Sequence, residues 1–530
     1  MRKWTRKVVG TVLCACVLLG PGTPWAAPSG AAGLQPKQLA GPPAEFEAMR
    51  EPDPAQAAIL SRSALLPVVL DATGRAVLRL PAHAGTLDAM LLTGGADWAP
   101  RLLSPAGHEL PGAELARATA VSRLGGERDG QAGAVIRLRD LAPGDWTLQL
   151  SGAPGARGYV LLRGGAELEL VSHQAHRRQR VGEPMTLLAM LAADAGTSAP
   201  RLGNDAGAVV SAQLRLLSPD GRERLLPMAA DGRGGGDGLL AGHFVPDAAG
   251  TWIAQVVVHG RDGGGRGFVR TAEHVIPVLG PGLRLAGTAA TAEPAGPGRL
   301  QVALPVAAAR EGTHVRVLAE VWGRDARGME VPVAWIGGMA PVAGGRLALG
   351  LDERWIARSG AGAPFELRAL RIEDPDHFIP LATAARLPLA LPSQRGRATA
   401  TTAAAAGPVD ETMRMGPRPA RMEMAAAATG SKLLLVHGYC SAGVWPQSQF
   451  ANAATFLDAH QNRSHDQFAL RLRDFGAQWN SFGTVAHSQG GAAALHLYSY
   501  YWSGLDNAGA GRLMQSVGTP YQGTNLAGII

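Results

Sequence analysis

The chain has 530 residues, a length that suggests three or four domains. It is rich in Gly (70) and Pro (37) and poor in aromatic residues (5%), which fits turn-rich β domains with small cores. The formal net charge is +7, and removing the four positive charges of the first seven residues leaves +3. Because the sequence contains no dense basic patch with interleaved aromatics, it gives little support for nucleic-acid binding.

The amino terminus has the layout of a secretory signal peptide. A basic segment without acids, Met1–Lys7, precedes the apolar run Val8–Leu19 and a pair of small residues ending at Ala27. The apolar run is too short to span a bilayer as a mature helix. We therefore predict cleavage after Ala27 and a secreted or periplasmic protein. Lipidation at Cys16 is not expected, because apolar residues continue past it, and Cys440 is then the only thiol that remains.

Residues 28–54 are polar and Pro-rich and are predicted to form a tether. Three β-patterned blocks follow, at 55–170, 181–280 and 281–392, with short strands and turn signals at regular spacing. The clearest strand, Thr251–Val258, follows a Pro-Asp corner and resembles the corresponding strand of bacterial immunoglobulin-like (Ig-like) domains. We predict β-sandwiches that act as spacers or bind cell-envelope or extracellular ligands. An Ala-rich stretch, 393–430, is predicted to be a linker.

The most informative stretch lies near the carboxyl terminus. An apolar, β-prone run, Phe482–Val485, stops at Ser488, and a helix-forming run, Ala492–Tyr500, follows at once. Small residues beside the serine, among them Gly490, leave room for a sharp turn. A strand, an exposed serine and a helix in this order form the context of a nucleophile elbow. The alternative is an ordinary serine near a Gly-Gly turn.

A second stretch supports the elbow. The apolar run from Lys432 ends in His437-Gly438 and predicts a buried parallel strand that leads into a tight loop. It lies about fifty residues before Ser488, where α/β hydrolases place a loop of the oxyanion hole. Between the two stretches, helical spacing predicts helices over Gln447–His460 and around Phe468–Trp479, and residues 513–517 predict the next strand.

Residues 431–530 resemble bacterial lipases of the α/β-hydrolase fold. The resemblance rests on His437-Gly438, on the run from Ala486 to Gly491 and on the later Ser516–Thr524 segment. The same region is similar to a secreted group described as conditioned medium factor-like. The fold class predicted is therefore β-sandwich (immunoglobulin-like) modules followed by a C-terminally incomplete α/β-hydrolase domain.

The lipase resemblance implies a role for each residue of the motif. Ser488 would be the nucleophile, and the backbone amides of Gln489 and Tyr439 would form the oxyanion hole for an acyl-ester or lipid substrate. His437, Gly438, His487 and Gly490 would be structural.

The catalytic acid and base have no fitting candidate in the sequence. After Ser488 the only acid is Asp506 and the only histidine is His496, which lies within the elbow helix. Neither occupies the place that the fold requires. We expect a truncated serine-dependent ester hydrolase; the alternative is a non-catalytic extracellular binding or signalling factor with a vestigial hydrolase domain.

No cofactor or metal is expected. His437, His460, His465 and Asp466 fit no common zinc spacing, and loop polarity explains them better. The Gly-Gly runs of the β-patterned blocks lie in hairpins, so they predict no dinucleotide or phosphate loop.

Overall fold

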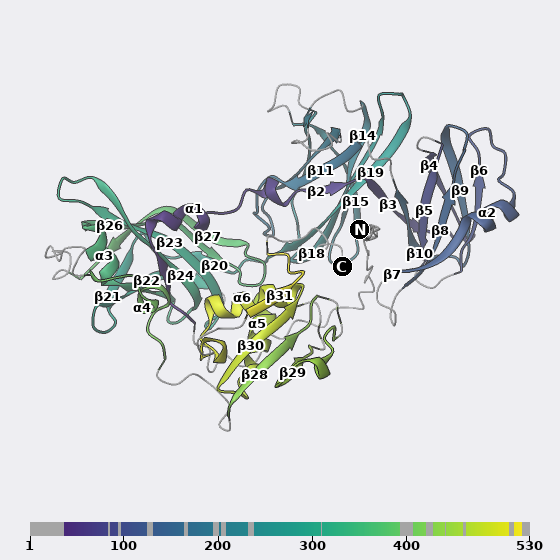
Figure 1. Cartoon of the computed structure of the whole chain (residues 1–530). Coiled ribbons are helices and arrows are strands. Elements are labelled where there is room, and N and C mark those ends of the chain that lie inside the picture. Colours follow the sequence, from purple (N-terminus) through teal and green to yellow (C-terminus); the bar gives the residue numbers. More distant parts are fainter. Residues whose placement is uncertain are drawn as a thin grey trace, which may run out of the picture. The chain divides into compact units, whose positions relative to one another are not determined.

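A computed structural model gives the fold of the chain (Figure 1). The structure describes residues 36–521 except 83–84, 94–96, 125–130, 164–167, 194–200, 203–207, 232–237, 309, 393–405, 420–427, 440, 442, 459, 461–462 and 508–513. The predicted signal peptide, 1–27, lies outside these residues. The described residues form two compact units, one of residues 53–280 and the other of residues 36–52 with 281–521.

The first β-sandwich of the 53–280 unit packs a five-stranded sheet, ordered β3-β10-β5-β8-β7, against a three-stranded sheet, β4-β9-β6. All strand pairs are antiparallel, and alternate residues of β9, Trp146, Leu148 and Leu150, are buried in the core. The elements are β3 (Ser63–Val69), β4 (Arg75–Ala82), β5 (Leu87–Leu92), β6 (Ala99–Leu103), α2 (Gly112–Ala118), β7 (Thr119–Leu124), β8 (Gln131–Leu138), β9 (Gly144–Ser151) and β10 (Arg157–Arg163).

The second β-sandwich has one sheet ordered β16-β17-β12-β11-β2, with β13 beside β12, and another ordered β15-β14-β18-β19. The predicted strand Thr251–Val258 lies within β18. The elements are η2 (Pro54–Ala57), β2 (Ile59–Ser61), β11 (Leu168–Gln174), β12 (Met185–Ala193), β13 (Arg201–Leu202), β14 (Ala208–Leu217), β15 (Glu223–Pro227), β16 (Ala229–Ala230), β17 (Leu240–Phe244), β18 (Gly250–Arg261) and β19 (Gly267–Val278).

A buried polar cluster joins these two sandwiches. The Leu65 backbone N–H donates to Thr271 Oγ1 at 2.9 Å, and the Gln255 amide donates to the Leu65 carbonyl at 2.6 Å. The Glu273 carboxyl accepts from Thr271 Oγ1 and from the Gln255 amide. Burial raises the pKa of Glu273, although these two hydrogen bonds oppose the shift.

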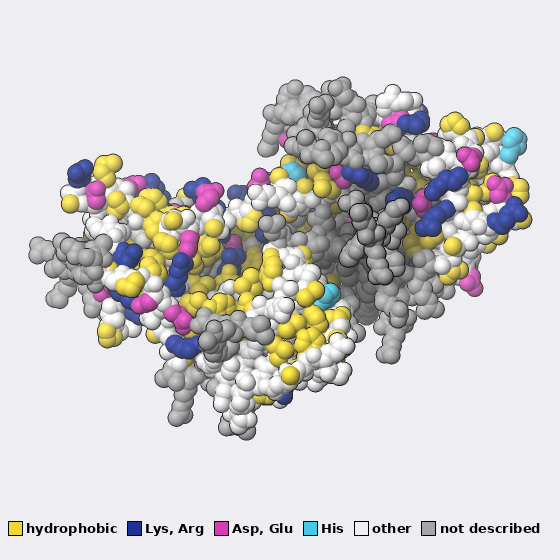
Figure 2. Space-filling model, viewed as in Figure 1, with side chains coloured by type: hydrophobic (Ala, Val, Ile, Leu, Met, Phe, Trp, Pro, Cys, Tyr) yellow, Lys and Arg dark blue, Asp and Glu magenta, His cyan; other side chains and the backbone are white. Residues whose placement is uncertain are grey.

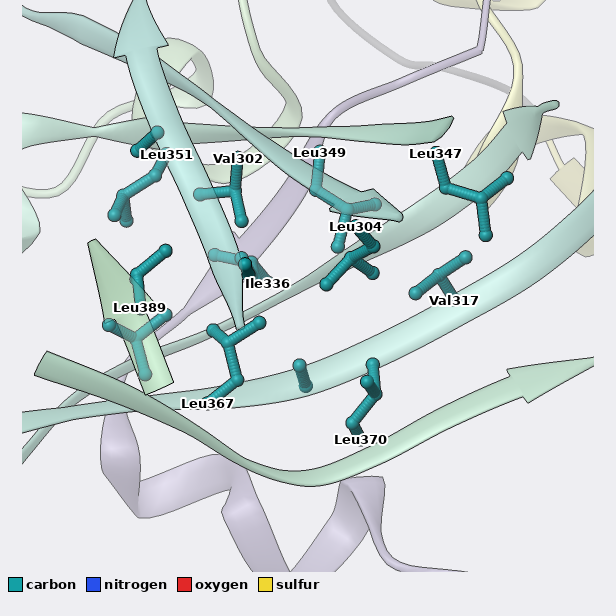
Figure 3. Packing of buried hydrophobic residues seen from close by; sticks show 14 of the residues in the cluster. Val302, Leu304, Val317, Ile336, Leu347, Leu349, Leu351, Leu367, Leu370 and Leu389 are labelled. Carbon is teal, nitrogen blue, oxygen red and sulfur yellow. The ribbon is translucent and has the colours of Figure 1, made fainter. Parts of the chain in front are cut away.

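The third β-sandwich forms the larger part of the second unit. Its strands follow the order β1-β24-β23-β26-β27-β21-β22-β20, with β25 beside β22. Figure 3 shows branched side chains from β22 to β27 pointing toward one another in the core, and Val302, Ile336 and Leu367 among them are fully buried. The elements are β20 (Leu283–Leu285), β21 (Ala290–Pro294), β22 (Arg299–Ala308), β23 (His314–Arg324), β24 (Glu330–Pro341), β25 (Arg346–Asp352), α3 (Glu353–Ser359), β26 (Gly362–Glu373) and β27 (Pro380–Ala390).

Segments on either side of the third sandwich also pack against it. In the predicted tether, β1 (Leu39–Gly41) pairs with β24 and is followed by η1 (Pro43–Glu45) and α1 (Phe46–Met49). In the predicted linker, α4 (Glu411–Met415) buries Met413 in the core of the third sandwich. Arg414 joins the two segments through hydrogen bonds to the Glu45 carboxylate. The described parts of the tether and linker are therefore packed structure.

The carboxyl-terminal domain is a small α/β domain. Its sheet has the order β29-β28-β30-β31, and all three strand pairs are parallel. The helices α5 and α6 pack on one another and on the core of this sheet (Figure 1). The elements are β28 (Ser431–Val436), η5 (Gln447–Gln449), β29 (Ala453–Phe456), α5 (His465–Gly476), β30 (Ser481–His487), α6 (Gln489–Tyr500), η6 (Gly504–Asn507) and β31 (Met514–Val517).

The prediction of a helix over Gln447–His460 is wrong. These residues instead form η5 and the edge strand β29. Asn452 has a left-handed backbone, φ 51°, that ends any helical continuation, and Phe456 is buried against the parallel neighbour β28. The predicted second helix corresponds to α5, and the strand predicted over residues 513–517 corresponds to β31.

The surface does not present a single sign of charge. On the face drawn in Figure 2, basic and acidic side chains are interspersed over the β-sandwich domains. Among the described residues no helix is long and apolar enough to cross a membrane.

Candidate functional site around Ser488

Ser488 lies at the turn between β30 and α6, at the carboxyl end of a parallel strand. Its backbone is strained, with φ 51° and ψ −126°, in a region that residues with a side chain rarely occupy. The turn is held by two contacts: Ser488 N donates to the Val517 carbonyl at 3.0 Å, and Thr519 Oγ1 donates to the Ser488 carbonyl at 2.8 Å. The side chain is half-buried and does not cap the helix. Ser488 thus has the sharp turn that the sequence predicts.

Two glycines allow the loops of the site to come together. A Cβ added at Gly490 would lie 2.3 Å from the His437 carbonyl oxygen. A Cβ added at Gly438 would lie 2.7 Å from Ser488 Cβ. The loop after β28 and the elbow are therefore in direct contact, and both predicted structural glycines are needed there because any side chain would separate them.

We expect Gly490→Ala to destabilise the α/β domain by about 1–3 kcal/mol, because the new methyl group would collide with backbone. The measurement is denaturant-dependent hydrogen exchange of peptides from β28, β30 and α6. Gly443→Ala is the matched control, since a Cβ there meets the Leu457 side chain at an ordinary 3.5 Å. Equal exchange in both variants would contradict the steric argument.

His437 organises the loop next to the serine. Its Nδ1 lies 2.7 Å from the Gly438 carbonyl, and its Nε2 accepts from the Asp458 backbone N–H at 3.0 Å. A carbonyl only accepts and an amide only donates, so the ring is neutral with its proton on Nδ1. The ring also stacks on Phe456 and Phe468, with centroids 5.7 and 5.0 Å apart. Both nitrogens are thus engaged in supporting the loop.

The two predicted oxyanion donors follow the contacting segments. Gln489 is the first residue of α6, where backbone N–H groups lack intrahelical acceptors. Its side chain is turned aside to donate to the Arg463 carbonyl at 2.7 Å. Tyr439 directly follows Gly438, whose own N–H donates to Ser441 Oγ at 2.8 Å. The helix dipole would favour negative charge near this end of α6.

His496, Asp466 and Asp506 near the elbow have partners other than Ser488. His496 Nε2 lies 2.9 Å from Asp466 Oδ1, which also accepts from Tyr501 Oη at 2.7 Å. Asp506 forms a buried ion pair with Lys37. His487 Nδ1 is buried without a hydrogen-bond partner. Among the described residues, none makes a hydrogen bond to the Ser488 hydroxyl.

The part of the chain that the structure describes contains no group of three or more His, Cys, Asp or Glu side chains suited to a metal ion. His437 contacts the Gly438 carbonyl and the Asp458 amide, and Asp466 contacts His496 and Tyr501. The pKa of His465 is lowered, chiefly by burial and also by the nearby His496.

A groove on the third sandwich is a feature that the sequence did not reveal. It has a volume of about 460 Å³ and lies between β23, β24, β26 and β27 and the segment Met49–Glu51. Trp335 and Leu370 contribute to its mostly apolar lining, and Glu320 and Arg371 are among its charged residues. It forms where the amino-terminal segment meets the sheet, a long-range contact that no local pattern encodes.

These features define a chain of three Ig-like β-sandwich domains followed by a small parallel α/β domain. In a comparison with protein-family models, each of these four domains matches a model from the same family. The conditioned medium factor 1st, 2nd and 3rd Ig-like domains match residues 63–162, 168–278 and 316–417, and its C-terminal domain matches residues 428–530. Four successive parts of the chain thus match four domain models of the conditioned medium factor family. The predicted Ig-like modules are confirmed, whereas the lipase resemblance stays a prediction.

A curated relative supports the same assignment. The chain is 38% identical over 341 residues to conditioned medium factor of Dictyostelium discoideum. The match covers 60% of this chain and 48% of the relative, so the chain spans about half the length of the relative it matches.

Similarities to solved structures are weak. A DUF4785 family protein from Legionella pneumophila matches with a TM-score of 0.42 and 13% identity, over 62% of this chain and 89% of that one. A Bacillus licheniformis lipase, BlEst2 in its propeptide form, matches with a TM-score of 0.24 and 10% identity, over 41% of each chain. Neither similarity is close enough to carry an argument.

Proposed function

We propose that the chain is an extracellular factor that acts by binding a partner, as part of a protein related to conditioned medium factor. The observation that carries this proposal is the match of all four domains, in order, to one family whose curated relative is named for conditioned medium. The signal peptide predicted from the sequence supports export. Ig-like sandwiches present loops and faces suited to binding.

The surroundings of Ser488 are compatible with a non-catalytic role. A serine hydroxyl is a weak nucleophile without an adjacent base. In the described residues, His496 pairs with Asp466 and Asp506 pairs with Lys37, so neither serves Ser488. The α/β domain would then contribute a folded surface to the factor.

The test is to express the full chain with its own leader, to recover it from the medium and to measure its binding to cells that produce it. We expect saturable binding that an excess of unlabelled protein displaces. A truncated chain ending at residue 280 is compared to ask which unit carries the binding. Retention of the full chain inside the cell, or binding that does not saturate, would contradict the proposal.

A second candidate function is serine-dependent acyl transfer, and the strained backbone of Ser488 specifically favours it. Strain at one residue is a feature of functional sites, and ligands of parallel sheets bind at the carboxyl ends of strands. In this mechanism Ser488 Oγ would attack an acyl-ester carbonyl and transfer its proton to a base. The amides of Gln489 and Tyr439 would hold the oxyanion, a contribution of about 3–4 kcal/mol per donor. The base and its acid would be residues outside those described.

If this second function holds, an active-site-directed phosphonate labels Ser488. We then expect Ser488→Ala to reduce labelling by about 10³-fold or more, since nothing replaces the nucleophile. Ser516→Ala is the matched control, because Ser516 is an exposed serine on the neighbouring strand β31. Labelling that survives Ser488→Ala, or its absence in a protein that includes the base and acid, would exclude acyl transfer at this residue.

A further inference from the structure

Residues 36–41 run from the α/β domain to the third Ig-like domain within one compact unit. Pro36 forms a β-bridge with Tyr501, and Lys37 N donates to the Tyr500 carbonyl at 2.8 Å. The next residue, Gln38, donates its backbone N–H to Met415 O at 3.0 Å. Leu39–Gly41 then join the sheet of the third domain as β1. We call residues 36–41 the amino-terminal clasp.

The contact with the α/β domain centres on a buried charge. Lys37 Nζ lies 2.7 Å from Asp506 Oδ1, and both side chains are 0% exposed. The ammonium also lies over the rings of Tyr498 and Trp502, 4.4 and 4.8 Å from their centroids. Burying a lysine is costly unless a partner balances its charge. An unpaired Asp506 would carry the same penalty, so each residue depends on the other.

The same lysine also completes the end of the helix that begins after Ser488. The last carbonyls of a helix have no intrahelical donor, and the carboxyl end carries partial negative charge. Lys37 donates to two of these carbonyls, from its backbone to Tyr500 and from Nζ to Tyr498. Arg418 donates to the Asp506 carbonyl and so ties the segment after the helix as well. Helix α6 is therefore held at one end by the elbow and at the other by the clasp.

The third domain is shaped to receive the clasp. A Cβ added at Gly338 would lie 2.6 Å from the Lys37 carbonyl oxygen, and one added at Gly416 would lie 2.9 Å from Gln38 Cβ. The Gln38 side chain accepts from Arg299, which in turn pairs with Asp352. These contacts are independent of the Lys37–Asp506 pair and fix the clasp from its other side.

We propose that the clasp holds the α/β domain against the third Ig-like domain and that the buried Lys37–Asp506 ion pair is the contact on which this attachment depends. Separating the pair releases helix α6 and, with it, the support behind the Ser488 turn. The carboxyl-terminal domain therefore depends on a segment from the opposite end of the chain. This segment lies close to the amino terminus that the expected export cleavage would leave. The proposal concerns conformation alone and does not depend on whether the protein binds or catalyses.

The test is hydrogen exchange of the full chain, with Lys37→Met as the main variant. Local opening sets the exchange rate, so we expect α6 and η6 to exchange about 10- to 100-fold faster, while the 53–280 unit is unchanged. Arg50→Met is the matched control, since Arg50 pairs with Glu47 on the same segment but both are exposed. It should leave α6 unchanged.

A second variant distinguishes the loss of the Lys37–Asp506 ion pair from a general loss of folding. In Lys37→Met with Asp506→Leu, no buried charge is left unpaired, so we expect exchange in α6 to return to within about threefold of the parent. If Lys37→Met alone is insoluble, recovery of soluble protein in the double variant supports the proposal equally. Unchanged exchange in Lys37→Met, or a double variant no better than the single one, would overturn it.

Discussion

Replacing Trp252 with alanine is expected to destabilise the second Ig-like domain by about 3–5 kcal/mol. Trp252 is 1% exposed on β18, and its ring lies 6.1 Å from that of Phe244 across the core. Its indole Nε1 donates to the Ala248 carbonyl at 2.9 Å, which closes the corner before the strand. The substitution removes the packing, leaves a cavity and takes the indole donor away from the partly buried Ala248 carbonyl, and these costs act together.

Hydrogen exchange in increasing denaturant measures this loss for peptides of β14, β18 and β19 separately from the rest of the chain. Val210→Ala is the control, since Val210 lies on the adjacent strand β14 and is 66% exposed. It should cost less than about 0.5 kcal/mol. A Trp252→Ala variant as stable as this control would mean that the core of the domain is not built around Trp252.

The second Ig-like domain is also expected to lose stability in acid through His274. Burial, and to a smaller extent the charge of His173, lowers the pKa of His274 from 6.5 to about 4. Its Nε2 lies 2.8 Å from Ser172 Oγ, whose hydroxyl donates to the Leu188 carbonyl, so the imidazole donates through Nε2. With a pKa of about 4, the imidazole is neutral at pH 7. Because the folded pKa lies below the unfolded one, the stabilising contribution is present above about pH 6.5 and is lost as pH falls through about 4.

The difference between the two pKa values corresponds to about 3 kcal/mol across this window. The neighbouring Glu273 acts in the opposite direction: its raised pKa favours the folded state at low pH, and that contribution is lost as pH rises through its folded value. His274→Leu should therefore remove the acid-dependent loss of stability of this domain. The measurement compares the stability obtained from hydrogen exchange at pH 7 with that at pH 4. His243→Leu, at an exposed position of β17, should retain it. The same loss in both variants would assign the acid transition to other groups.

The sequence predicted the features that local patterns encode. The β-prone run Thr251–Val258, which follows a Pro-Asp corner, predicted a strand, and this run lies within β18. The elbow was predicted because a strand, small flanking residues and a helix restrict Ser488 to a sharp turn, and the structure gives it φ 51°. The helix over Gln447–His460 failed because apolar spacing alone cannot distinguish a short helix from an edge strand, and the parallel partner β28 decided the outcome.

The sequence by itself predicted the three β modules, the Ig-like character of the sandwiches and the serine turn. It also predicts an export signal, which lies outside the described residues. Only the tertiary structure assigned partners to the polar residues around that turn: Asp506 to Lys37, His496 to Asp466, and His437 to the loop it supports. The physical reason is sequence separation. Lys37 and Asp506 lie 469 residues apart in the sequence. Only the fold brings this lysine of the predicted tether to the carboxyl end of α6, where its buried charge is balanced by Asp506.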